Sequence, residues 1–231
     1  MPRALPALAV GAAMLGFVAL GVWQLERRVW KLDLIQRVEA GLAAAPVAAP
    51  GSGAWRGLSR EADEYRRVVA TGHFMHENEV AVQAVTELGG GYWVLTPLVT
   101  RDFVVLVNRG FVPPDRRDPA TRLAGQAPGQ VTVAGLLRLS EPGGAFLRSN
   151  HPAAGRWYSR DVAAIAATEG IGRVAPYFID ADAQPNPGGF PVGGLTLVHF
   201  RNPHLSYALT WFAMAALLAF FSLRALRGDV R

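Results

Sequence analysis

The chain has 231 residues, enough for one domain plus membrane anchors, since domains usually span about 100 to 200 residues. Apolar residues make up 51% of it, and the formal charge at pH 7 is +5. Between residues 50 and 200, however, 14 arginines balance 14 aspartates and glutamates, so the positive surplus lies near the two ends. A neutral central region argues against nucleic acid as a partner. The absence of cysteine excludes disulfides, zinc ribbons and thiol chemistry.

Two runs near the ends are almost without charge. Residues 4–23 contain no ionisable side chain, and within Leu205 to Leu223 the phenol of Tyr207 is the sole ionisable group. At about 1.5 Å per residue, either run spans the roughly 30 Å hydrocarbon layer of a bilayer. We therefore predict transmembrane helices over 4–23 and 204–223. The alternative for the first run is a cleaved signal peptide, with Ala19 and Gly21 as weak cleavage candidates.

The sequence after the first run favours an anchor over a signal peptide. Apolar residues recur with helical spacing at positions 25, 29, 32 and 35, so we predict a helical extension over 24–40. Trp23 and Trp30 have the amphipathic rings that settle between water and lipid.

Charges beside the spans give conflicting signals about topology. Two spans place both termini on one side and the domain on the other. Three arginines favour a cytoplasmic tail over 224–231, whereas four basic residues between 27 and 37 favour a cytoplasmic domain. Because long loops cross membranes largely regardless of their charge, the short tail has more weight. We expect the central domain outside the cytoplasm.

The central region has the pattern of a mainly β (α+β) domain over 58–203, preceded by a linker over 41–57 rich in alanine, proline and glycine. The domain should begin near Tyr65. Short runs rich in β-branched and aromatic residues predict strands over 66–74, 80–85, 92–99, 103–108, 131–139, 177–180 and 195–200. Their close spacing favours antiparallel pairing, in either a small barrel or a sandwich.

The connections are also readable. We expect hairpin turns at 89–91 and 100–102, and a short helix over 162–169 with Ser159 or Asp161 as its N-cap and Gly170 near its end. Residues 185–194 contain too many prolines and glycines for a helix or strand, so they predict an ordered loop.

Enzyme motifs are missing. The chain has no Gly-x-Ser-x-Gly elbow, no phosphate-binding Gly-Lys-Ser/Thr loop and no Gly-x-Gly-x-x-Gly fingerprint, so we predict that it is not an enzyme. His73 and His76 lack the four-residue separation of zinc peptidases, which favours a surface or turn role. Asp180 and Asp182 are spaced to share a strand face, but without a third ligand or partner a catalytic role is disfavoured.

The start of the second span is the most informative segment. At 100° per residue, His204, Tyr207, Ala208 and Trp211 fall on one helical face. Ionisable residues at a membrane boundary are costly and are therefore functional candidates. Neutral imidazole is a standard axial ligand of haem iron, and a face of small and aromatic residues suits a flat macrocycle.

Antiparallel pairing of the two spans would bring Trp23, Gln24, Arg27 and Arg28 to the same membrane surface, where the arginines could pair with haem propionates. His204 is then the expected metal ligand, through haem iron alone. The alternative is structural: His204 forms hydrogen bonds at the interface, while Tyr207 and Trp211 serve helix packing. The residues by themselves leave both interpretations open.

In four segments the sequence resembles the surfeit-locus (Surf-one) family of cytochrome c oxidase assembly factors, found in bacteria and mitochondria. They are residues 21–28 (GVWQLERR), 107–113 (VNRGFVP), 187–194 with the next strand, and 202–211. Their order between two terminal spans makes the combination specific. Phe111 stands where the family usually has tryptophan, and Pro203 where a polar residue is common. Neither difference removes a candidate ligand.

The resemblance implies an assembly factor in the bacterial inner membrane with its central domain on the periplasmic side. It further implies that the protein binds haem a transiently through His204 and aids insertion of this haem into the catalytic subunit of the oxidase. Haem a synthase is a further implied partner. The alternative is a membrane scaffold that stabilises oxidase assembly intermediates without ever binding haem.

Overall fold

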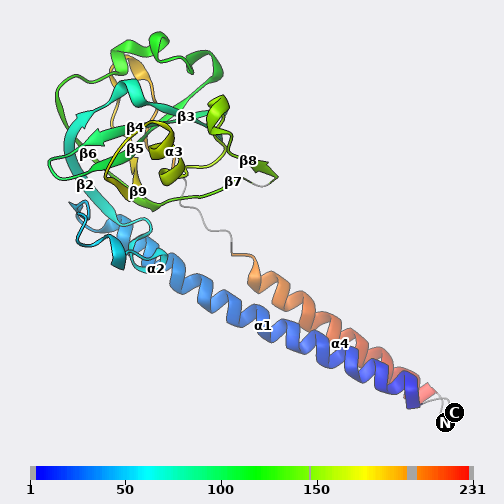
Figure 1. Ribbon diagram of the computed structural model, residues 1–231. Coiled ribbons are helices and arrows are strands. Elements are labelled where there is room, and N and C mark those ends of the chain that lie inside the picture. Colours follow the sequence, from blue (N-terminus) through cyan, green and yellow to red (C-terminus); the bar gives the residue numbers. More distant parts are fainter. Residues whose placement is uncertain (1–3, 146, 197–201, 229–231) are drawn as a thin grey trace. The chain divides into compact units, whose positions relative to one another are not determined.

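The structure is a computed structural model that describes residues 4–145, 147–196 and 202–228 (Figure 1). It divides into two compact units. One contains residues 1–37 and 198–231, and the other contains residues 38–197. The first unit consists of a helix pair and the second is a β-rich domain, as the sequence predicts.

The helix pair is formed by α1 (Ala4–Ala43) and α4 (His204–Gly228). The described parts of both helices, Leu8–Ala43 and His204–Ala225, are long enough to cross a membrane, and each contains an apolar window of 18 residues. Only 6% and 11% of these apolar windows is buried within the protein, so their side chains are available to lipid. The core helix of a soluble domain would be mostly buried instead.

The β-rich domain is a barrel, which decides between the two predicted architectures. Its sheet has the order β1-β2-β6-β9-β5-β4-β3, and a further pairing between β2 and β4 closes it. The barrel strands are β2 (Arg67–Phe74), β4 (Gly89–Val99), β5 (Val104–Val112), β6 (Gln130–Leu139) and β9 (Val174–Ala181). The edge strands are β3 (Val80–Thr86) and β1 (Val47–Ala48), and β7 (Gly144–Ala145) and β8 (Arg148–Ser149) form a separate small hairpin.

Alternation along the strands creates two apolar clusters. Inside the barrel, Val105 and Val107 of β5 pack with Tyr177 and Ile179 of β9. On the opposite face, Phe178 packs with residues of α3 (Val162–Thr168), which covers that face (Figure 1). Asp161 caps α3 by accepting a hydrogen bond from the backbone N–H of Ala164, at 3.1 Å. The predicted helix and one of its two candidate caps are therefore confirmed.

Several details differ from the prediction. The pairs β5–β9 and β1–β2 are parallel, whereas every other pair is antiparallel among the described strands. The glycines at 89–91 do not form a turn, because they pair with 84–86 inside the β3–β4 ladder. The predicted strand 195–200 lies mostly outside the described residues, and 195–196 have no regular structure.

Part of the predicted linker 41–57 packs against the barrel. Helix α1 continues to Ala43, and Trp55 packs against the interior cluster. The buried hydroxyl of Tyr177 donates a hydrogen bond to the carbonyl of Pro50, at 2.8 Å. Burial raises the pKa of Tyr177, so the hydroxyl keeps its proton and remains a donor.

Asp180 lies at the centre of a buried ion network. Its carboxylate accepts hydrogen bonds from Asn108 at 2.7 Å, Arg138 at 2.9 Å and Arg160 at 3.2 Å. Burial lowers the pKa of Arg138, but the charges of Asp180 and Glu64 outweigh burial and raise that pKa above its ordinary value. The network explains why this aspartate tolerates burial, and it is the structural role that the sequence favoured.

Asp180→Ala should therefore destabilise the protein strongly. Asn108, Arg138 and Arg160 would each lose one hydrogen-bond acceptor, and breaking a buried network costs about 3 to 5 kcal/mol. Asp182→Ala is the matched control, because the Asp182–Arg67 pair is about one-third exposed and such pairs contribute about 0 to 1 kcal/mol. Chemical denaturation of the full chain in detergent, followed by circular dichroism, measures both. Similar losses in the two variants would contradict the assigned role of Asp180.

Candidate functional site

The two helices of the pair run antiparallel and touch closely. Residues 17, 21 and 24 of α1 contact residues 211, 212 and 204 of α4, so the two chain directions are opposed. The helices lie side by side (Figure 1). A Cβ added to Gly21 would lie 2.5 Å from the ring of Phe212, so any larger residue there would force this ring to move. On α4, Ala208 and Ala215 are buried. Small residues at such contacts let helix backbones approach each other, as is common in membrane helix pairs.

This contact brings His204 to Gln24. The Nδ1 atom of His204 lies 2.7 Å from Oε1 of Gln24, within hydrogen-bond distance. Because an amide oxygen can only accept, Nδ1 must donate the proton. In a neutral imidazole the lone pair then lies on Nε2. Gln24 thus selects the tautomer in which His204 can coordinate a metal through Nε2.

Aromatic residues of α4 lie next to this pair. Trp211 stacks on Phe17 of α1, with ring centroids 5.7 Å apart and an angle of 26° between the planes. Tyr207 is 54% exposed and does not pack into the helix contact. The predicted face therefore divides into two parts: His204, Ala208 and Trp211 face α1, and Tyr207 lies at the edge of that contact.

The basic and aromatic candidates on α1 lie just beyond Gln24. The guanidinium of Arg27 lies 4.0 Å from the centroid of the Trp30 ring, which is a cation–π contact. Trp23 is 53% exposed, and Arg28 is partly buried. The structure thus brings Gln24 directly to His204, whereas no direct contact joins Trp23, Arg27 or Arg28 to His204 among the described residues.

Sequence reasoning missed Phe17, Gly21 and Phe212. The signal was present on α1, because residues 17, 21, 24 and 28 are separated by four, three and four positions and therefore share one helical face. A glycine on that face is the mark of a close helix contact. From the sequence, residues were assigned to a helical face in α4 only.

The two clusters that the sequence disfavoured as metal or catalytic sites have structural partners. His76 lies 3.1 Å, through Nε2, from the carbonyl oxygen of Ala127, and its ring contacts Phe74. Asp182 pairs with Arg67 at 2.5 Å. Within the described ranges, no three His, Cys, Asp or Glu side chains gather in a way that could hold a metal ion.

Comparison with known proteins gives a consistent result. The model of the SURF1 family matches residues 11–216. Surfeit locus protein 1 of Rattus norvegicus is 36% identical over 222 residues, covering 89% of this chain and 70% of the rat protein. The Mus musculus protein of the same name is 37% identical over 214 residues, covering 85% and 68%. The SURF1-like protein of Monosiga brevicollis is 40% identical over 212 residues, covering 86% and 78%.

The helix contact makes a testable prediction. Gly21→Ile should separate the helices around Phe212 and move Gln24 away from His204. The native chain has no cysteine, so a Gln24→Cys/His204→Cys double variant reports the contact through a short thiol cross-linker in membranes. We expect efficient cross-linking, and a marked loss when Gly21→Ile is added. Gly16→Ile is the control, because a Cβ there meets nothing within 4 Å. Equal loss of cross-linking in the Gly21→Ile and Gly16→Ile variants would contradict the contact.

Proposed function

Because this chain belongs to the SURF1 family, we propose that it is an assembly factor for cytochrome c oxidase and binds haem a through His204. Family membership supports the assembly role. The observation that supports haem binding is the His204–Gln24 hydrogen bond at 2.7 Å, because it leaves Nε2 as the available ligand atom. Partners that orient a ligating histidine in this way are typical of metal sites and strongly affect affinity.

The side chains around His204 fit a flat, largely apolar molecule with an anionic edge. Tyr207 and Trp23 expose about half of their surface and offer ring faces or edges beside the helix contact. Arg27 and Arg28 follow Gln24 within about one helical turn and provide positive charge for carboxylates. When bound, haem iron would act as the Lewis acid that accepts the Nε2 lone pair, and His204 would be the residue that holds the molecule.

In this proposal the protein makes and breaks no covalent bond in the haem. It holds haem a on the helix pair and passes it to the catalytic subunit of the oxidase, with haem a synthase as the expected donor. The two apolar helices anchor it in the bacterial inner membrane, and the barrel lies on the periplasmic side. Binding through a single histidine would suit a carrier, because one coordination bond can be exchanged at the acceptor.

His204→Ala should abolish most haem binding. The protein is purified from a host that makes haem a, and its absorption spectrum is compared with that of wild type at equal protein concentration. His151→Ala is the matched control, because His151 is an exposed histidine of the barrel domain. The expected result is a Soret band lost in His204→Ala and retained in His151→Ala. Equal haem content in all three proteins would remove His204 from the role.

The scaffold alternative predicts a different pattern of oxidase maturation. Gly188 has φ +74°, and its Cβ would lie 2.9 Å from that of Ala124, so Gly188→Val should displace the 185–194 loop. If the protein acts through haem, His204→Ala lowers oxidase activity in the membranes of a complemented deletion strain. Full activity with His204→Ala, together with loss in Gly188→Val, would favour a scaffold. Gly53→Val, where a Cβ meets nothing within 4 Å, is the control.

A further inference from the structure

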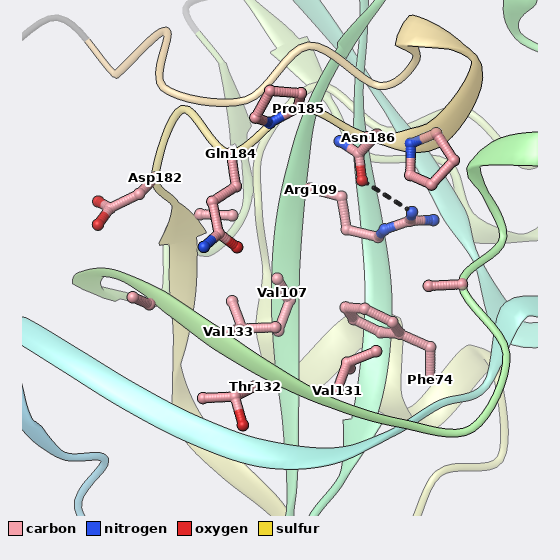
Figure 2. A pocket seen from close by; sticks show the side chains of 14 residues that line it. Phe74, Val107, Arg109, Val131, Thr132, Val133, Asp182, Gln184, Pro185 and Asn186 are labelled. Atoms are coloured by element: carbon pink, nitrogen blue, oxygen red, sulfur yellow. Dashed lines mark hydrogen bonds between the residues drawn. The ribbon is translucent and has the colours of Figure 1, made fainter.

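One end of the barrel contains a pocket whose lining residues all belong to the β-rich unit. It has a volume of about 290 Å³, close to the lower limit of ligand-binding pockets at roughly 300 Å³. Phe74, Val107, Val131 and Val133 form apolar walls that continue the barrel interior, and residues 184–187 form the opposite wall (Figure 2). Barrel mouths are common places for small-molecule sites.

Strand β5 contributes one charged residue, Arg109, to this pocket. In the β4–β5 ladder, Gly110 pairs with Val94 and Asn108 pairs with Leu95, so Arg109 is the extra residue of a β-bulge. Bulges often redirect a side chain beside a functional site. Arg109 is 3% exposed, and its guanidinium lies 4.9 Å from the centroid of the Phe74 ring. Its Nη2 atom donates hydrogen bonds to the carbonyl of Gly125 and, at 3.2 Å, to Asn186; the second is drawn in Figure 2.

The positive charge of Arg109 is only partly compensated. The nearest carboxylate, Glu79, accepts two hydrogen bonds from Arg122 and one from Thr96. Its Oε2 atom lies 3.8 Å from Nη1 of Arg109, too far for a hydrogen bond. Nη1 is buried and has no hydrogen-bond partner among the described residues. Two buried arginines thus share one carboxylate, which leaves a net charge of +1.

The other groups of the pocket do not cancel this charge. Asp182 also lines the pocket, but Arg67 already pairs with it at 2.5 Å. Burial lowers the pKa of Arg109, which is the expected response of a cation held without a full counter-charge. Buried charges are normally paired, so this one indicates a missing anionic partner.

We propose that this pocket binds the carboxylate of a small apolar molecule or chain end, with Arg109 as its ion-pair partner. A guanidinium matches the two oxygens of a carboxylate, and a single negative charge balances the net charge of the cluster. Phe74 and the three valines then surround the apolar body of the ligand. Asn186 and Gln184 provide further polar groups on the 184–187 wall, where Figure 2 shows them around the same space.

Ligand pairs that differ only in charge test this proposal on the full chain in detergent. Hexanoate is compared with hexanamide, and N-acetyl-leucine with N-acetyl-leucinamide, by the concentration dependence of the unfolding temperature and by ligand-observed NMR. Each acid should bind saturably and raise the unfolding temperature, and each amide should not. The acid with the higher affinity identifies the source, either a free aliphatic acid or a peptide C-terminus.

Two variants separate binding from folding. Arg109→Lys keeps the charge but removes the planar fork, and should weaken binding roughly tenfold or more. Val133→Phe fills the pocket without altering Arg109 and should also abolish binding, while Val85→Phe, at an 87% exposed position, should not. Equal effects of acid and amide, a response to inorganic phosphate alone, or unchanged binding in Val133→Phe would each overturn the proposal.

Discussion

The close contact between α1 and α4 at Gly21 is the constraint on which the candidate haem site depends. Lipid tails are as apolar as the helix surfaces, so two helices in a bilayer associate through close packing and polar contacts. Here Gly21 accepts the ring of Phe212, and the same alignment places Gln24 at 2.7 Å from His204. A bulkier residue at position 21 would therefore affect the position of His204 as well as the helix packing.

Buried arginines organise the barrel domain, which has no cysteine and, among its described residues, no cluster of side chains that could hold a metal ion. Arg138 and Arg160 meet Asp180 on one side of β9, and Arg109 and Arg122 meet Glu79 beyond the bulge in β5. The two clusters differ in the balance of positive and negative charge. Arg138 and Arg160 share three carboxylates, those of Asp180, Glu64 and Glu141, whereas Arg109 and Arg122 share the carboxylate of Glu79. This difference is why only the second cluster suggests a ligand.

Local sequence pattern was enough to predict most strands, helix α3 and both apolar helices, because period and capping depend on neighbouring residues. It did not predict the parallel β5–β9 pair or the closure of β2 on β4, which depend on contacts between distant segments. The glycines at 89–91 resembled a turn but lie in β4. At the site, the helical spacing of residues in α4 identified His204. The face of α1 that contacts it, which includes Phe17 and Gly21, could be identified only once the alignment of the two helices was known.

The central claim is that this protein carries haem a to a nascent oxidase. Its most direct test is affinity purification of the tagged protein from mildly solubilised membranes during oxidase synthesis, with subunits identified by mass spectrometry and haem measured spectroscopically in the same fraction. We expect both the catalytic subunit and haem a to be recovered with the protein. Recovery of the catalytic subunit without haem would contradict the carrier role, and recovery of neither would contradict the assembly role as well.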